Sequence, residues 1–391
     1  MNRSQRLLVA LASATAVALP TGVLAADRTS GHSGTGAGTR AALRAVVEQG
    51  TPGVIAEVSR RDGTWTAAYG VADTRTGRRR TPPEHFRIAS MTKPFTAATL
   101  LLLEADGLLS LEDSVERWLP GVVRGNGYDA EKISIRRLLN HTSGISNYND
   151  DAGFRARYAG DAFEENRYTR VTPRELVDIA LAHPPVFPPG QKGRWKYSDT
   201  NFVLAGMVIE RVTGHRYERV VDERIIQPLD LDGTRAPGPS PKLPRPHAVH
   251  YSTLFEDVPD AKVRDVTELS PTVAFAAGEI VSTTRDVNRF MTSLMRGEFL
   301  RPRQRRAMLD TVPVGTADGH GGADDLYGLG IRKFRIAEGC WVWGHGGMIP
   351  GSASRTAVTG DGGHALTMNR NGDWGDQRLE DEVLRAEFCP R

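Results

Sequence analysis

Cysteine is scarce in this sequence, with two residues among 391, and the ten histidines form no His-Glu-x-x-His motif. Zinc sites usually need closely spaced Cys or His ligands, or that missing motif on a helix. The glycine-rich stretches 34–38 and 344–351 do not connect a predicted strand to a helix as a dinucleotide fingerprint does, so we interpret them as a flexible lead-in and a tight turn. We therefore expect neither a metal ion nor a cofactor.

An excess of charge of one sign is also missing, because lysine and arginine exceed aspartate and glutamate by only three (50 against 47). The basic clusters at 78–80 and 301–306 are short, whereas nucleic-acid binding needs a concentrated basic face. Hydrophobic residues make up 39% and charged residues 25%, as in ordinary soluble proteins. We expect a monomeric, enzyme-sized protein of roughly two to three domains that binds no nucleic acid.

One long apolar run, residues 7–19, lies near the N-terminus. Two arginines precede it and small residues follow it, so residues 1–25 are typical of a cleaved signal peptide. A membrane anchor is the alternative, but the run is shorter than the roughly 20 residues of a spanning helix, and Pro20 ends it. We expect a secreted, extracellular protein with no stable membrane insertion.

The two cysteines, Cys340 and Cys389, form an even pair, which in an oxidising exported setting favours a disulfide. Closing that loop would stabilise the fold by roughly 4 kcal/mol on the chain-entropy model. Two buried reduced thiols are the alternative.

The pattern along the chain predicts an α+β protein. Residues 26–39 are a Gly, Ser and Thr-rich flexible lead-in, and the folded part should start near Arg40. Strand patterns dominate 40–95 and 271–391, which we assign to one discontinuous sheet domain, and helical patterns dominate an inserted domain at 96–270. The strand and helix segments expected in these regions are a helix near 43–47, a hairpin of 53–58 and 65–69, helices at 94–105, 135–139 and 202–212, a helix opened by a capping box at 172–175, strands at 327–331, 341–343, 354–358 and 365–368, and a final helix at 379–388.

Ser90 and Lys93 form a Ser-x-x-Lys motif where the chain turns into an apolar helix. At this spacing both side chains share one helix face, the hydroxyl lies near the positive end of the helix dipole, and the amine can assist removal of its proton. The motif alone is weak, because it occurs by accident and needs accompanying elements.

Accompanying elements follow in order. Tyr197 and Asp199 lie two residues apart at a predicted loop-to-helix corner, and His345 begins a glycine-rich segment after an aromatic strand. Taken singly, Tyr197 could be an aromatic near a helix cap and His345 a surface histidine beside a turn. Together with the Ser-x-x-Lys turn, they predict three polar walls that converge on one cleft.

These motifs resemble serine D-alanyl-D-alanine carboxypeptidases, in the group that also contains class C β-lactamases, esterases and D-amino-acid peptidases. The resemblance runs from about residue 40 to 389 and includes the segments 138–144, 201–215 and 327–332. It implies an antiparallel β-sheet flanked by helices, of the β-lactamase/transpeptidase type, built from both chain ends with an inserted mostly helical region. The cysteines also fall where exported carboxypeptidases of this kind place a disulfide.

The resemblance further implies a role for each motif residue. Ser90 would be the acylated nucleophile, Lys93 its partner, Tyr197 the general base that relays the proton to the leaving amine, and His345 part of the third wall. The oxyanion hole would be the backbone N–H groups of Ser90 and Met348. The substrate-binding positions would be Asp199, Arg332, Gly346 and Gly347, with the Arg332 guanidinium holding the substrate's terminal carboxylate.

Two positions depart from the family pattern. Asp199 stands where Asn is usual, and its charge should keep Lys93 cationic, so that Lys93 holds Tyr197 toward phenolate. Gly346 and Met348 replace hydroxyl residues that help to bind the terminal carboxylate, and an ester or D-peptide needs no such contact.

The expected function is an exported serine hydrolase that forms an acyl-enzyme, with D-alanyl-D-alanine carboxypeptidase activity on peptidoglycan-type peptides. The alternatives are an esterase, a D-amino-acid peptidase or a weak β-lactamase of the same family. A catalytically silent module that binds penicillin or peptidoglycan is the non-enzymatic alternative.

Overall fold

The computed structural model describes residues 36–256, 261–315, 324–376 and 378–389. The predicted signal peptide at 1–25 lies outside the described residues. Within the described ranges, no helix combines the length and apolar character needed to cross a bilayer.

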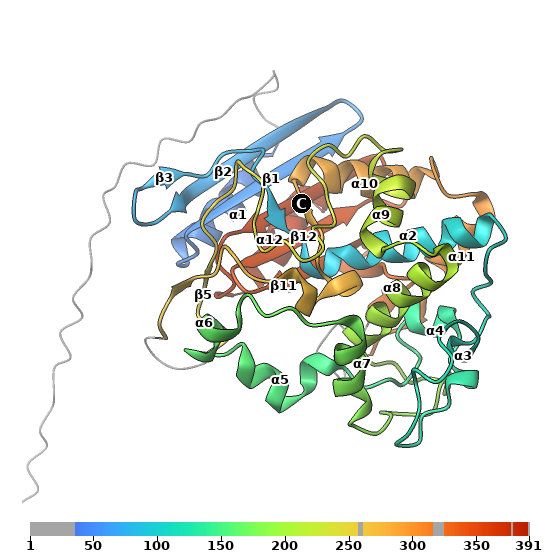
Figure 1. The fold of residues 1–391 in the computed structure, drawn as a ribbon. Helices are drawn as coiled ribbons and strands as arrows, with labels where there is room; N and C mark the ends of the chain where they lie inside the picture. The colour runs from blue at the N-terminus through green and yellow to red at the C-terminus, as the bar shows by residue number, and fades with distance from the viewer. Residues whose placement is uncertain (1–35, 257–260, 316–323, 377, 390–391) are drawn as a thin grey trace, which may run out of the picture.

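A nine-stranded sheet lies at the centre of the molecule (Figure 1), and both ends of the chain contribute to it. All of its neighbouring strands are antiparallel, and β1 pairs with β13 with Val54 opposite Arg370. This confirms the predicted α+β fold with an antiparallel sheet. From one edge to the other the strands are β3 (Arg78–Arg79), β2 (Gly63–Asp73), β1 (Gly53–Arg60), β13 (His364–Arg370), β12 (Ser352–Val358), β11 (Cys340–Ile349), β10 (Arg332–Ala337), β9 (Leu326–Tyr327) and β8 (Val312–Pro313).

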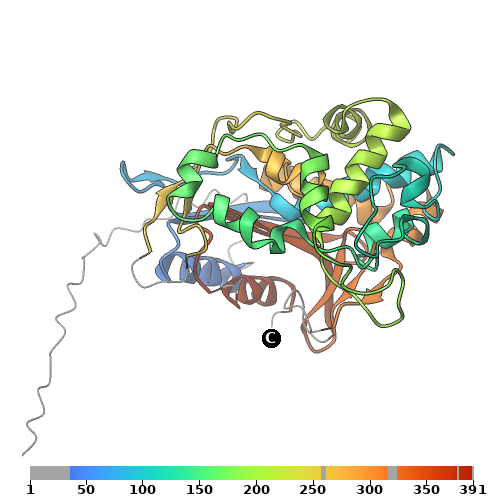
Figure 2. The ribbon, with the colours of Figure 1, turned by 60° about the horizontal axis from the view of Figure 1, so that its bottom comes forward.

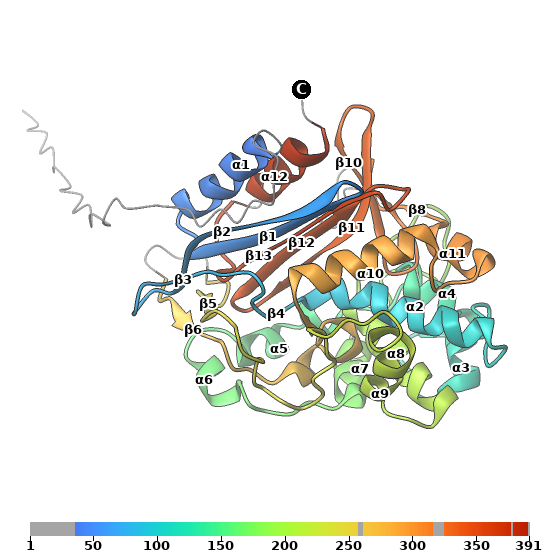
Figure 3. The ribbon, with the colours of Figure 1, turned by 90° about the horizontal axis from the view of Figure 1, so that it is seen from above.

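Two terminal helices, α1 (Ala37–Glu48) and α12 (Arg378–Phe388), cover one face of the sheet (Figure 3). Alternate residues of β1, such as Val54, pack with Leu43 of α1 in an apolar core on this face. Helix α1 begins at Ala37, so the flexible lead-in predicted for 26–39 is wrong in its last three residues.

The remaining helices cover the other face, as the view along the sheet in Figure 2 shows. Helix α2 (Thr92–Ala105) lies against α10 (Thr284–Arg296), where the rings of Phe95 and Phe290 stack. Their apolar residues share one core with those of α8 (Asp199–Thr213). The other elements on this side are α3 (Val115–Trp118), α4 (Ile135–Leu139), α5 (Ala152–Arg157), α6 (Ala162–Asn166), α7 (Pro173–Leu181), α8 (Asp199–Thr213), α9 (Tyr217–Val221) and α11 (Pro302–Leu309), with the short strands β4 (Phe86–Arg87), β5 (Tyr251–Ser252), β6 (Arg264–Asp265) and β7 (Val281–Ser282).

Local signals in the sequence explain where several helices begin and end. Thr172 and Glu175 form the expected capping box at the start of α7, in which each side chain accepts from the backbone N–H of the other residue. Gly214 ends α8 with a φ of 70°, a left-handed conformation that glycine adopts without strain.

Two predicted segments differ from the structure. The strand expected over 327–331 is wrong beyond Tyr327, because Gly330 turns the chain with a φ of 70° and a strand resumes only at Arg332. The glycine-rich segment from 344 is not a turn but the second half of β11. A Cβ on Gly347 would lie 2.1 Å from the carbonyl oxygen of Ile88, so glycine is needed there for close packing.

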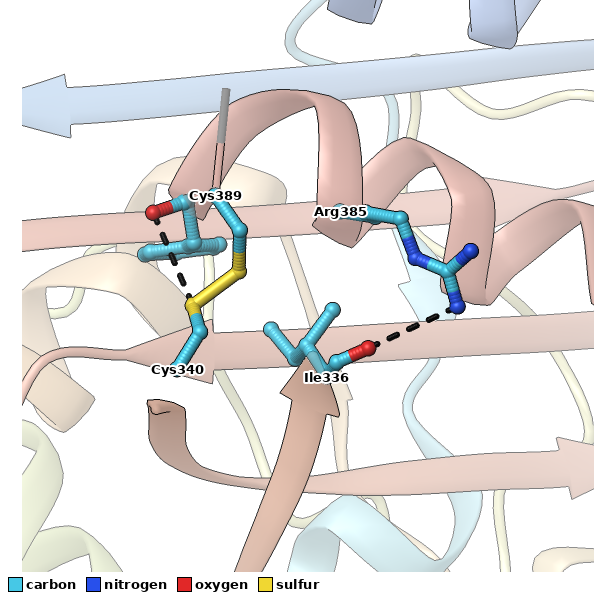
Figure 4. Close-up of a disulfide and its surroundings, with 5 residues drawn as sticks. Ile336, Cys340, Arg385 and Cys389 are labelled. Atoms are coloured by element: carbon cyan, nitrogen blue, oxygen red, sulfur yellow. Dashed lines mark hydrogen bonds between the residues drawn. A yellow bond between two sulfur atoms is a disulfide. The ribbon is translucent and has the colours of Figure 1, made fainter. Parts of the chain in front are cut away.

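The disulfide between Cys340 and Cys389 is present and joins the start of β11 to the end of α12 (Figure 4). Arg385, also on α12, donates a 3.5 Å hydrogen bond to the carbonyl of Ile336 on β10. The final helix is thus attached to two adjacent strands.

The division into a sheet domain and an inserted helical domain stays a prediction. Its first boundary, between residues 95 and 96, falls inside α2, whose apolar residues belong to the same core as Ile55 of the sheet.

Candidate active site

Ser90 lies in a single 3-10 turn, Ala89–Met91, that leads from β4 into α2. Ala89 adopts a φ of 47°, which is strained for a residue with a Cβ and is tolerated mainly where the surroundings require it. The Lys93 Nζ donates a 3.0 Å hydrogen bond to the Ser90 Oγ. The predicted one-turn juxtaposition of hydroxyl and amine is therefore present.

Lys93 is fully buried, and its amine has three acceptors. Besides the Ser90 hydroxyl, it donates to the Asp199 Oδ1 at 2.6 Å and to the carbonyl oxygen of Ala277 at 2.9 Å. Burial lowers the pKa of Lys93, and the Asp199 carboxylate counteracts this. Three acceptors match the three protons of an ammonium, so the geometry fits a charged Lys93.

Asp199 is the first residue of α8, and it lines a cavity beside Ser90. Its Oδ2 accepts a 2.6 Å hydrogen bond from the Asn149 Nδ2, and its backbone N–H donates to the Asn147 Oδ1 at 3.1 Å. Both oxygens of the carboxylate are thus occupied, one by Lys93 and one by Asn149. This fixes the carboxylate beside the ammonium.

The Tyr197 hydroxyl is hydrogen-bonded to Ser90. The Lys93 Nζ lies over the Tyr197 ring, 4.9 Å from its centroid. Burial and the Asp199 charge raise the pKa of Tyr197 well above its ordinary value, and the Ser90 hydrogen bond and the Arg332 charge counteract them. This direction opposes a phenolate at rest, and the expectation that Lys93 holds Tyr197 toward phenolate stays a prediction.

His345, on β11, is buried and contacts Tyr327 rather than the nucleophile. Its Nδ1 lies 2.5 Å from the Gly346 carbonyl, which can only accept, so its Nε2 accepts from the Tyr327 hydroxyl at 3.0 Å. Burial and the Lys93 charge lower the pKa of His345 well below its ordinary value. A neutral imidazole thus supports Tyr327, whose ring lies 5.5 Å from that of Trp195 in the aromatic cluster around Tyr197.

The second half of β11 passes directly beside the Ser90 turn. Strand β10 pairs with β11 only as far as Gly344, so residues 345–349 have β12 on one side and the 3-10 turn on the other. Ser90 and Met348 both line the cavity, as an oxyanion hole made by their N–H groups requires. That role stays a prediction.

Three predicted substrate-binding residues, Gly346, Gly347 and Arg332, are not among the residues that line the cavity, and their roles stay predictions. A Cβ on Gly346 would lie 3.2 Å from the Arg355 side chain, because Gly346 points to the opposite face of the sheet from Gly347. Arg332 donates to the Asp325 Oδ2 at 3.0 Å and is not among the lining residues.

The cavity beside Ser90 has a volume of about 590 Å³. Its polar lining residues include Ser90, Asn149, Arg155, Arg167, Asp199 and Ser270. Elsewhere its walls are mainly aromatic and aliphatic. The apolar lining includes Tyr148, Phe154, Tyr158, Phe163, Leu254, Phe255, Leu269, Val273 and Ile349. The described residues bring together no group of His, Cys, Asp or Glu that could hold a metal ion.

Sequence reasoning missed Asn149 and Tyr327, which hold Asp199 and His345 in place. The run Asn147-Tyr148-Asn149 was a usable signal, because amides and a phenol in succession are unusual in a helix-rich segment. Nothing in the sequence distinguishes the Ala277 carbonyl as an acceptor for Lys93.

Residues 39–388 match the Beta-lactamase family. The chain belongs to this family. The resemblance to class C β-lactamases and penicillin-binding proteins is therefore confirmed, and the chain is a serine hydrolase of this type.

Two solved structures of the family are especially similar. A D-stereospecific amidohydrolase from Streptomyces sp. has 45% identity and a TM-score of 0.83, over 91% of this chain and 99% of that one. The D-amino acid amidase from Ochrobactrum anthropi SV3, complexed with L-phenylalanine amide, has 29% identity and a TM-score of 0.76, over 89% of this chain and 97% of that one.

Curated relatives of the family match over shorter stretches. Penicillin-binding protein 4* of Bacillus subtilis (strain 168) is 28% identical over 274 residues, 68% of this chain and 56% of that protein. Esterase EstB of Burkholderia gladioli is 33% identical over 201 residues, 48% of each protein. The chain thus spans less than two thirds of the length of these curated relatives.

Proposed function

We propose that this protein is an exported D-stereospecific amidohydrolase that hydrolyses amides and peptides of D-amino acids through an acyl-enzyme on Ser90. The observation that carries the chemistry is the Ser90 hydroxyl, which lines a largely apolar cavity and is hydrogen-bonded to both Lys93 and Tyr197. The similarity to a D-stereospecific amidohydrolase and a D-amino acid amidase supports the substrate class.

In the acylation step, the Ser90 Oγ attacks the substrate carbonyl carbon and the carbon–nitrogen bond breaks. The neutral Tyr197 phenol accepts the Ser90 proton while its own proton passes to the departing nitrogen, so the side chain ends the step as it began. The cationic Lys93 stabilises the negative charge that develops on the Ser90 and Tyr197 oxygens during this transfer.

In the deacylation step, water attacks the ester carbon and releases the acid. The same hydrogen-bonded pair works in reverse, because Tyr197 accepts a proton from the water and returns one to the Ser90 Oγ. Both steps develop negative charge on the carbonyl oxygen, which the N–H groups of Ser90 and Met348 would hold.

The carboxypeptidase activity expected from the sequence is the second candidate. A C-terminal carboxylate needs a cationic or hydroxyl partner on the leaving-group side, and here Arg332 is already paired with Asp325. Gly346 and Met348 offer no side-chain hydroxyl. These features favour a neutral amide or ester leaving group over a free carboxylate.

The decisive experiment compares turnover of D-phenylalanine amide, L-phenylalanine amide, acetyl-D-alanyl-D-alanine, a short-chain p-nitrophenyl ester and a fluorescent penicillin. We expect the D-amide to be hydrolysed with the highest kcat/KM, and the L-amide at least tenfold less efficiently. Faster turnover of acetyl-D-alanyl-D-alanine than of the D-amide would instead identify a carboxypeptidase. A stable penicillin adduct without turnover of any substrate would identify a silent binding module.

Export is part of the proposal and rests on the signal-peptide pattern of residues 1–25. Expression of the full chain in a bacterial host that secretes proteins should give a mature product that begins at Ala26. Mass spectrometry of the culture medium measures this, and an intact N-terminus retained in the cells would contradict it.

A further inference from the structure

An ion pair lies on the strands beside the phenol of the candidate site. Arg332 begins β10, directly opposite Tyr327 of β9 and Gly344 of β11. Its guanidinium donates a 3.0 Å hydrogen bond to the Asp325 carboxylate, with 17% and 15% of the two side chains exposed. The pair is therefore largely shielded from solvent but still accessible.

The Arg332 charge acts on the reacting groups. The backbone partner of Arg332, Tyr327, packs in the same aromatic cluster as Tyr197, which is hydrogen-bonded to Ser90, and the guanidinium charge lowers the pKa values of Tyr197 and His345. Arg332 therefore lies on the strands beside the proposed proton relay. An unneutralised guanidinium in this position would attract a carboxylate on the leaving group.

Asp325 opposes that attraction in two ways. It accepts the guanidinium hydrogen bond, and its own negative charge repels an incoming carboxylate. Its backbone is fixed, because the Asp325 carbonyl accepts a 3.0 Å hydrogen bond from the buried Val314. The carboxylate thus stays beside Arg332 without help from a substrate.

We infer that Asp325 is a specificity-determining residue that neutralises Arg332 and so disfavours leaving groups with a free carboxylate relative to neutral amides and esters. The inference rests on the proposed function, because it names the leaving group that the same site accepts. Asp325 itself touches no reacting atom, and it acts through Arg332.

The chain offers a matched control in the preceding residue. Asp324 pairs with Arg335, three positions along β10 from Arg332, and about half of each side chain is exposed. The change Asp324→Asn removes the same charge from the same turn and leaves the Arg332 pair intact. A general effect of net charge would appear in both variants, whereas the proposed effect appears only in Asp325→Asn.

The test compares D-phenylalanyl-D-alanine with its C-terminal amide, two substrates that differ only in the charge of the leaving group. In Asp325→Asn, the kcat/KM ratio of acid to amide should rise about 10- to 100-fold, the usual effect of a charged hydrogen bond, mainly through a lower KM for the acid. The ratio should stay unchanged in Asp324→Asn and return to the wild-type value in Asp325→Asn/Arg332→Gln. An unchanged ratio in Asp325→Asn, or a gain that survives the loss of Arg332, overturns the inference.

A second measurement separates this inference from the proposed function. If neither dipeptide is hydrolysed, the proposed function fails, and acetyl-D-alanyl-D-alanine and its amide are then compared as inhibitors of p-nitrophenyl ester hydrolysis. Asp325→Asn should tighten inhibition by the acid alone, and equal inhibition constants in wild type and variant overturn the inference. If Asp325→Asn does not fold, Asp325→Ser removes the same charge with a smaller side chain and must give the same change.

Discussion

The two faces of the nine-stranded sheet hold their buried charges differently. On the face covered by α1 and α12, Glu387 accepts hydrogen bonds from Thr39 at 2.6 Å, Arg60 at 2.5 Å and His364 at 2.7 Å. Burial alone would raise the pKa of Glu387, but these hydrogen bonds lower it. The Glu387 carboxylate is thus stabilised in its ionised form, and its hydrogen bonds to Arg60 and His364 join α12 to β1 and β13.

On the opposite face, burial shifts the pKa values of two groups, Lys93 and Glu57, toward their neutral forms. Lys93 directs one of its three hydrogen bonds to a hydroxyl that is expected to react, Ser90. Glu57 of β1 has its pKa raised to about 7, because burial outweighs the nearby Arg285. Buried charges therefore hold elements together on the face covered by α1 and α12, whereas the opposite face contains groups whose protonation state can change.

The largest expected effect concerns the nucleophile on the second face. Ser90→Ala should lower kcat for ester and amide hydrolysis by about 10⁴-fold or more, because the Ser90 hydroxyl is the group proposed to form the acyl-enzyme. Initial-rate measurements test this, with Ser110→Ala as a control serine outside the cavity. Covalent penicillin label on Ser90→Ala would refute the assignment of the nucleophile.

The next largest effect concerns the face covered by α1 and α12, and it should not change catalytic activity. Replacing Cys340 and Cys389 together by Ser should lower the free energy of unfolding by about 4 kcal/mol, since the bridge restricts the unfolded chain. Urea unfolding measures the loss, and kcat/KM should stay within twofold of wild type. A large fall in kcat/KM at a temperature where the variant is folded would show that the two faces are coupled.

The pH dependence of the free energy of unfolding tests the comparison of the two faces at Glu57. Its pKa is raised from 4.5 to about 7 in the folded state, so the folded protein binds this proton more tightly than the unfolded chain does. This stabilisation is complete below pH 4.5 and is lost as the pH rises through 7. Glu57→Gln should therefore be more stable than wild type by about 3 kcal/mol at pH 8, and the difference should vanish near pH 4. Urea unfolding at both pH values tests this, and an equal difference at both would contradict it.

The smallest effect is expected at the carboxylate beside Lys93. Asp199 acts to raise the pKa values of both Lys93 and Tyr197, so Asp199→Asn should move the acylation pH profile toward lower pH and reduce kcat roughly tenfold. Stopped-flow acylation by a chromogenic ester gives the profile. Asp151→Asn is the control, because Asp151 pairs with His183 instead. An identical profile in Asp199→Asn would show that this carboxylate has no electrostatic role.

Local patterns were enough to predict much of the fold and the reacting groups. The spacing of Ser90 and Lys93, the capping box at Thr172 and the glycine after α8 each depend on residues within one or two helical turns. Such patterns determine local structure directly, and here they also predicted that Ser90 and Lys93 lie side by side.

Long-range contacts were not predictable in the same way. The cavity walls come from separate segments, such as Phe154 of α5 and Leu269 before β7, and nothing local in either marks it as a wall. The sequence does not show that the chain turns against α2 at Gly330 after the strand at Tyr327, or that Asp325 reaches the Arg332 guanidinium. Both facts depend on tertiary packing.

The pairing of β1 with β13 has a consequence for biosynthesis. Val54 and Arg370 are neighbours in the sheet but more than 300 residues apart along the chain. At a synthesis rate of about 5–20 residues per second, the first hairpin waits about 15–60 s for its partner strand to leave the ribosome. Strand β11, which borders the Ser90 turn, is also translated late. For most of translation, the nascent chain therefore contains Ser90 but lacks the strand that completes the proposed active site.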